Sequence, residues 1–135
     1  MIRFDFSNFE GDNSKFENIL LKNEYTYPDI TEITGDFQIL INGNVFFSEP
    51  YFPILEFLKA AVSWIDCSDE SEEMLYSSIE TDENPLIAFT KKDGRWTIHS
   101  PWQKYECSDT FDKNDVICAV SCLKKDLMTR ISCSK

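Results

Sequence analysis

The pattern of apolar and polar residues in the first third of the chain predicts a strand followed by a β-hairpin. Apolar and polar residues alternate over residues 2–7, which is the period of a strand with one buried face. A second alternation covers residues 37–41, and Asn42 and Gly43 separate it from an apolar-rich run at residues 45–47. Asn-Gly between two such runs is the strongest short signal of a hairpin, because both turn residues need a positive φ.

Two later segments carry apolar residues at helical spacing. The first begins at Tyr51 or Pro53 and ends at about Asp66, and apolar residues cover most of its circumference, so we expect it in the core. The second begins at Asp112, whose side chain can cap the helix, and it has Asp115 in its first turn. Its apolar stripe consists of Val116, Val120, Leu123 and Leu127.

The segment between these two helices predicts a meander of four strands. Turn signals separate four apolar-rich runs, at residues 74–80, 86–90, 96–99 and 102–107. The resulting order is β-β-β-α-β-β-β-β-α, and residues 14–23 fit either a short helical turn or irregular structure. We therefore expect an α+β fold, with a mainly antiparallel curved sheet of about six to seven strands and two main helices packed on one face. The length of 135 residues fits a single domain over residues 1–135.

The charge of the chain narrows the choice of partners. The sequence contains 24 acidic and 13 basic residues, which gives a formal net charge of -11. This excess of negative charge argues against nucleic acid as a partner and against binding to anionic lipid, since both need a basic surface. It favours a cationic partner, or it serves only to keep the protein soluble.

Negative charge is most concentrated between Asp66 and Glu83, where the sequence has eight acidic residues and no basic one. Such a surface speeds the association of a cationic protein, and an aromatic side chain within it can anchor the contact. We call this stretch the acidic segment, and its predicted partner-binding residues are Asp66, Asp69, Glu70, Glu72, Glu73, Tyr76, Glu80, Asp82 and Glu83.

Catalytic and metal-binding motifs are absent from the sequence. It has no glycine-rich phosphate loop and no Gly-x-Ser-x-Gly turn, so we expect neither an enzyme nor a cofactor. An alternative is a small enzyme that uses His99, the single histidine, together with Cys107 on a neighbouring predicted strand. Cys118 and Cys122, two of five cysteines, share one face of the last helix, either as small buried residues or as a thiolate pair for a metal or for redox chemistry.

The N-terminal sequence lacks the apolar run of a secretory signal, and no stretch approaches the roughly 20 apolar residues of a membrane span. We therefore expect a cytoplasmic protein that does not bind a membrane.

Small size, a strongly acidic α+β domain, no export signal and no catalytic motif together resemble the immunity proteins of bacterial toxin systems, including those of contact-dependent growth inhibition. The resemblance covers the whole chain and carries over no individual residue. It implies a cytoplasmic protein, expected to be a monomer, that binds the toxic domain of a cognate effector, often a basic nuclease, and covers its active site. A third hypothesis is an interaction adaptor in which Trp96 and Trp102 form an exposed aromatic platform. The alternative is that these two residues are core or half-buried, as large aromatic side chains usually are.

Overall fold

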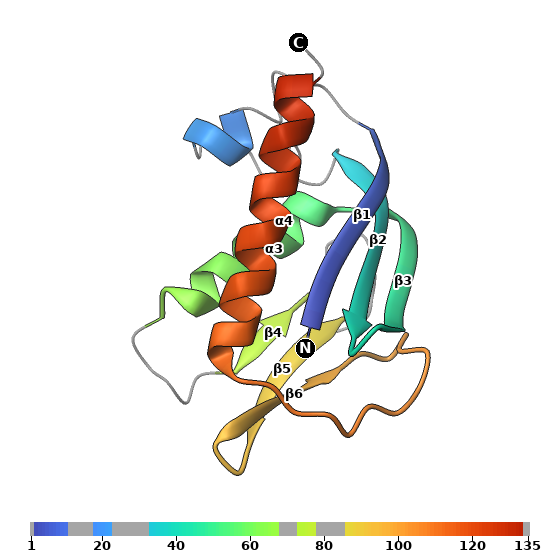
Figure 1. The fold of residues 1–135 in the computed structure, drawn as a ribbon, viewed down its shortest axis with the longest axis vertical. Helices are drawn as coiled ribbons and strands as arrows, with labels where there is room; N and C mark the ends of the chain where they lie inside the picture. The colour runs from blue at the N-terminus through green and yellow to red at the C-terminus, as the bar shows by residue number, and fades with distance from the viewer. Residues whose placement is uncertain (1, 11–17, 23–32, 68–72, 78–85, 134–135) are drawn as a thin grey trace.

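A computed structural model describes residues 2–10, 18–22, 33–67, 73–77 and 86–133. The described part has an α+β fold, as predicted (Figure 1). Its elements in chain order are β1 (Ile2–Glu10), the short π-helix η1 (Asn18–Lys22), β2 (Thr34–Ile41), β3 (Asn44–Phe52), α3 (Ile54–Ile65), β4 (Met74–Tyr76), β5 (Ile87–Lys92), β6 (Arg95–His99) and α4 (Lys113–Cys133).

The first three strands form an antiparallel sheet in the order β1-β2-β3. The predicted hairpin is confirmed, since β2 and β3 are joined at Asn42 and Gly43, whose φ angles are 51° and 86°. Along β2 every second residue is buried, so this sheet has one face in the core and one face turned away from it.

Gly43 allows a clean test of this turn, because an added Cβ would meet no atom within 4 Å. Gly43→Ala should therefore cost only the penalty of a positive φ, about 1 kcal/mol of unfolding free energy. Urea denaturation measures this loss. A cost near zero would contradict the left-handed conformation that the turn is expected to require.

The prediction of one sheet of six to seven strands is not confirmed. In the described residues, β4, β5 and β6 form a second, separate antiparallel sheet of three strands. The expected strand at 102–107 is also absent, because local side-chain bonds turn the chain at this point: Ser100 Oγ accepts a hydrogen bond from the Trp102 amide, and Gln103 Oε1 accepts one from the Ser100 amide. The Trp96 backbone in β6 pairs instead with Phe111.

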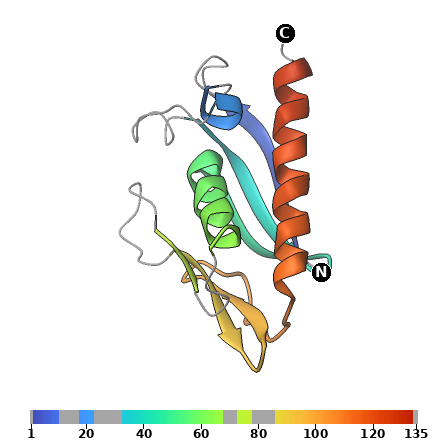
Figure 2. The same ribbon diagram turned by 90° about the vertical axis from the view of Figure 1, so that its left-hand side faces the viewer.

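The helix predicted to begin at Tyr51 or Pro53 and to end at about Asp66 is confirmed as α3, although Tyr51 belongs to β3 and the helix begins at Ile54. This helix packs against both sheets (Figure 2). Near its N-terminus, the Phe57 ring lies 5.2 Å from the Phe37 ring of β2, measured between centroids. Near its C-terminus, Trp64 contacts Phe89 of β5 and Trp96 of β6, at centroid distances of 5.4 and 4.9 Å. One helix thus supplies apolar cover to both sheets.

The last helix, α4, lies along β1 and also contacts α3 (Figure 1). Its predicted apolar stripe is buried, as expected. Its first turn differs in detail from the prediction, because the Asp112 side chain accepts a hydrogen bond from Arg95 at 2.8 Å. The side chain that accepts a backbone hydrogen bond at this end of the helix is that of Asp115, whose Oδ2 accepts from the Asp112 amide at 3.1 Å.

Candidate functional site

The sheet face that points away from α3 is the candidate site. Polar side chains cross it in register, with Asp5 of β1 opposite Gln38 of β2, and Gln38 opposite Ser48 of β3. These residues alternate with the apolar residues of the core face, so the period of two in the sequence produces both the core and the polar face.

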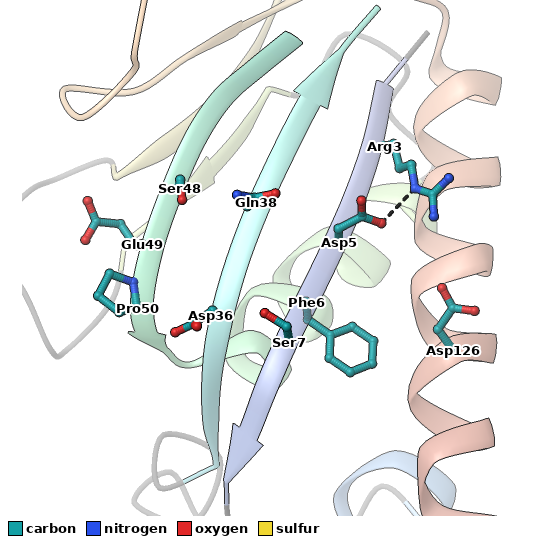
Figure 3. Close-up of a pocket in the computed structure, with 10 residues that line it drawn as sticks. All are labelled: Arg3, Asp5, Phe6, Ser7, Asp36, Gln38, Ser48, Glu49, Pro50 and Asp126. Carbon is teal, nitrogen blue, oxygen red and sulfur yellow. Dashed lines mark hydrogen bonds and ion pairs between the residues drawn. The ribbon is translucent and has the colours of Figure 1, made fainter. Parts of the chain in front are cut away.

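This polar face forms an open groove of about 740 Å³, which Figure 3 shows. We call it the outer groove. Three strands and α4 line it with Arg3, Asp5, Phe6, Ser7, Asp36, Gln38, Ser48, Glu49, Pro50 and Asp126.

The outer groove is acidic, because its lining has four carboxylates and one cation. Arg3 donates a hydrogen bond to Asp5 at 2.7 Å, in an ion pair that is largely exposed to solvent and therefore adds little stability. The pKa of Arg3 is raised, chiefly by this hydrogen bond and the charge of Asp5, and further by the charge of Asp126. The other carboxylates, Asp36 and Glu49, lie across the groove from Arg3 on β2 and β3 (Figure 3).

The acidic segment is described only in part. Asp66, directly after α3, and Glu73, directly before β4, are both exposed. The remaining acidic residues of the prediction, Asp69, Glu70, Glu72, Glu80, Asp82 and Glu83, lie outside the described residues.

The prediction that Tyr76 anchors a partner is wrong. Tyr76 is only 2% exposed, and its hydroxyl donates a hydrogen bond to the buried Glu56 at 2.6 Å. On β4 the side chain exposed to solvent is the neighbouring Leu75, at 62%. The residues of β4 alternate between a buried and an exposed face, and Tyr76 lies on the buried face.

Tyr51 is an exposed aromatic residue that the sequence analysis missed. It is 75% exposed, and it follows Pro50, which lines the outer groove. Its φ angle is 53°, a left-handed conformation that is costly for a bulky residue. The signal in the sequence is the pair of prolines, Pro50 and Pro53, on either side of Tyr51 and Phe52, because proline disturbs regular strand geometry. An exposed aromatic beside a groove is a typical anchor in protein interfaces.

The structure differs from the geometry that was expected for the two alternative sites. The proposed enzyme needed Cys107 on a strand beside β6, and no such strand forms, while Nε2 of the exposed His99 lies 3.0 Å from Thr97 Oγ1 of its own strand. The adaptor hypothesis needed exposed tryptophans, but Trp96 is 4% exposed and Trp102 is half-buried, stacked on Phe47.

Two cysteines on α4, Cys118 and Cys122, were the other candidate ligands for a metal ion. Cys118 and Cys122 are exposed, so the interpretation of these two as buried small residues is wrong. Within the described ranges, no group of three or more His, Cys, Asp or Glu side chains is placed to hold a metal ion. None of the helices in the same ranges is long and apolar enough to cross a membrane.

Comparison with known proteins gives a single result. No curated protein and no solved structure matches the chain significantly. Residues 2–132 match the model of a domain of unknown function, DUF7878, which therefore spans almost the entire chain. The chain belongs to the DUF7878 family.

Proposed function

We propose that this protein is a non-catalytic inhibitor that acts in the cytoplasm as an immunity protein and binds a cationic toxin domain. Its partner would be a domain whose active-site cleft carries lysine and arginine, as in a basic nuclease. The inhibitor would occupy this cleft with carboxylates in the places where substrate phosphates bind.

The observation that carries the proposal is the outer groove. Its four carboxylates come from β1, β2, β3 and α4, so the fold fixes their separation better than a flexible loop would. Clustered charge of one sign on a rigid surface speeds the association of an oppositely charged partner by 10-fold to 1,000-fold at low salt. Tyr51, beside the groove, adds an apolar contact of the kind that dominates binding energy.

The first experiment identifies the partner. The polymorphic C-terminal domain of a large secreted protein encoded next to this chain is the expected toxin. Co-expression with the inhibitor should restore growth of cells that produce the toxin domain, and calorimetry should detect a stable complex. Absence of both effects with every neighbouring candidate, and with proteins captured from the native host, contradicts the proposal.

A matched pair of charge reversals then tests the site. Glu49→Lys places a cation in the outer groove, whereas Glu106→Lys makes the same change at an exposed position outside it. We expect Glu49→Lys to slow association with the toxin about tenfold, and Glu106→Lys to change it much less. Stopped-flow kinetics at low and high salt give both rates, and circular dichroism confirms that both variants are folded.

A third variant separates the outer groove from the acidic segment. Lysine at Asp69, Glu70, Glu72 and Glu73 reverses the charge of the acidic segment and leaves the outer groove intact. If only this variant associates more slowly with the toxin, the acidic segment binds the toxin and the outer groove does not. If neither variant changes the rate, electrostatic recognition of a cationic toxin is wrong.

A further inference from the structure

A second groove, which we call the edge groove, lies between β1 and α4. Its volume is about 590 Å³, and it is lined by Ile2, Arg3, Phe4, Asp115, Cys118, Ala119, Cys122 and Asp126. Its lining is more apolar than that of the outer groove, and two of its side chains are thiols. Both cysteines are exposed, so a solute can reach them.

The spacing of the two thiols limits what they can do together. Cys118 and Cys122 are four residues apart on α4, so their Cβ atoms lie about 5–6 Å apart on one helix face. A disulfide needs Cβ atoms about 3.5–4.5 Å apart, so the intact helix holds this pair too far apart to oxidise to one. The pair is close enough for both sulfur atoms to bind one small ligand.

We infer that Cys118 and Cys122 together bind one soft, monovalent metal ion, Cu(I), between their sulfur atoms. Zinc–thiolate bonds are about 2.3 Å long. With bonds of this length a linear S–Cu–S unit spans about 4.6 Å, which two side chains with Cβ atoms about 5–6 Å apart can reach. Soft thiolate ligands select Cu(I) over harder ions. Binding breaks two S–H bonds, forms two Cu–S bonds and releases two protons to solvent, and the oxidation state of copper does not change.

The absence of further ligands favours this coordination. Zinc needs four ligands, and no third metal-ligating side chain converges on these thiols within the described part of the chain. Linear two-coordination is a normal geometry for Cu(I), and it needs only two sulfur ligands.

One cation, Arg3, and two carboxylates, those of Asp115 and Asp126, line the edge groove beside the thiols. Two thiolates and one monovalent ion carry one net negative charge, and the Arg3 guanidinium lines the same groove. Binding of Cu(I) at this site does not require the toxin partner, so the two proposals are tested independently.

The test uses Cu(I) held at a known free concentration by a coloured chelator, without oxygen, and follows its transfer to the full chain. A Cys133→Ser background removes the thiol at the end of α4. We expect one Cu(I) per chain, with an affinity that rises with pH because two protons leave. Cys118→Ser and Cys122→Ser should each weaken binding about 100-fold, since the second thiol on the same helix acts at high effective concentration.

Matched controls are available in the same chain. Cys67→Ser and Cys107→Ser remove half-buried thiols outside the edge groove and should leave the Cu(I) affinity unchanged. Native mass spectrometry should show one ion on one chain. Full affinity in either α4 variant, or one copper shared by two chains, overturns the assignment.

Discussion

Phe57→Ala should lower the free energy of unfolding by about 3–5 kcal/mol, which is the usual cost of removing a fully buried aromatic ring. Phe57 has no exposed surface, and its ring contacts four others, those of Phe4, Phe37, Phe52 and Tyr76, at centroid distances of 5.3, 5.2, 6.3 and 5.4 Å. These rings come from both sheets, so the cavity left by alanine cannot close by moving one element. Urea denaturation followed by circular dichroism measures the loss.

The control for Phe57→Ala is the removal of an exposed aromatic ring. Tyr51 is 75% exposed, and Tyr51→Ala should change the free energy of unfolding by no more than about 0.5 kcal/mol. Comparable losses in the two variants would mean that Phe57 is not a central core residue, and would contradict the packing of α3 between the sheets.

Tyr76→Phe should cost about 1.5–3 kcal/mol of stability, although it removes a single oxygen atom. The Tyr76 hydroxyl donates to Glu56 Oε1 at 2.6 Å, and Glu56 is 4% exposed. Its other oxygen, Oε2, has no hydrogen-bond partner among the described residues, so the phenylalanine would leave the buried carboxyl group without a donor from this part of the chain. Thermal and urea unfolding both measure the effect.

A double-mutant cycle separates this hydrogen bond from simple packing. Glu56→Met replaces the carboxyl group with an apolar side chain of similar length. The double variant Tyr76→Phe with Glu56→Met removes both polar partners of this hydrogen bond, so neither position keeps an unpaired polar group. The double variant should be more stable than Tyr76→Phe alone, because replacing both partners of a buried bond is far cheaper than removing one. Additive losses in the cycle would mean that the two side chains do not interact.

Local signals in the sequence predicted most individual elements. Asn42 and Gly43 specify their turn through conformations that few other residues tolerate, and the apolar stripes of both helices lie within single elements. The division into two sheets could not be predicted in this way, because it depends on which distant strands pair. The missing strand at 102–107 shows a different limit, since hydrogen bonds that the Ser100 and Gln103 side chains accept from backbone amides override an apolar-rich pattern.

The candidate site was only partly predictable. The excess of acidic residues indicated a cationic partner, but the outer groove combines residues far apart in the sequence, from Asp5 to Asp126, and only strand register brings them together. Tyr76 illustrates the remaining ambiguity. Both faces of β4 carry apolar residues. The alternation of side chains along a strand therefore places Leu75 and Tyr76 on opposite faces but does not tell which face is buried.

The position of α3 determines how the protein loses its structure. Its first half covers the β1-β2-β3 sheet through Phe57, and its last turns cover the β4-β5-β6 sheet through Trp64. If this helix unwinds, each sheet loses the apolar side chains that α3 packs against it, and a three-stranded sheet with less apolar cover has little stability of its own in water. Both sheets therefore depend on the same twelve-residue helix, and we expect them to unfold together.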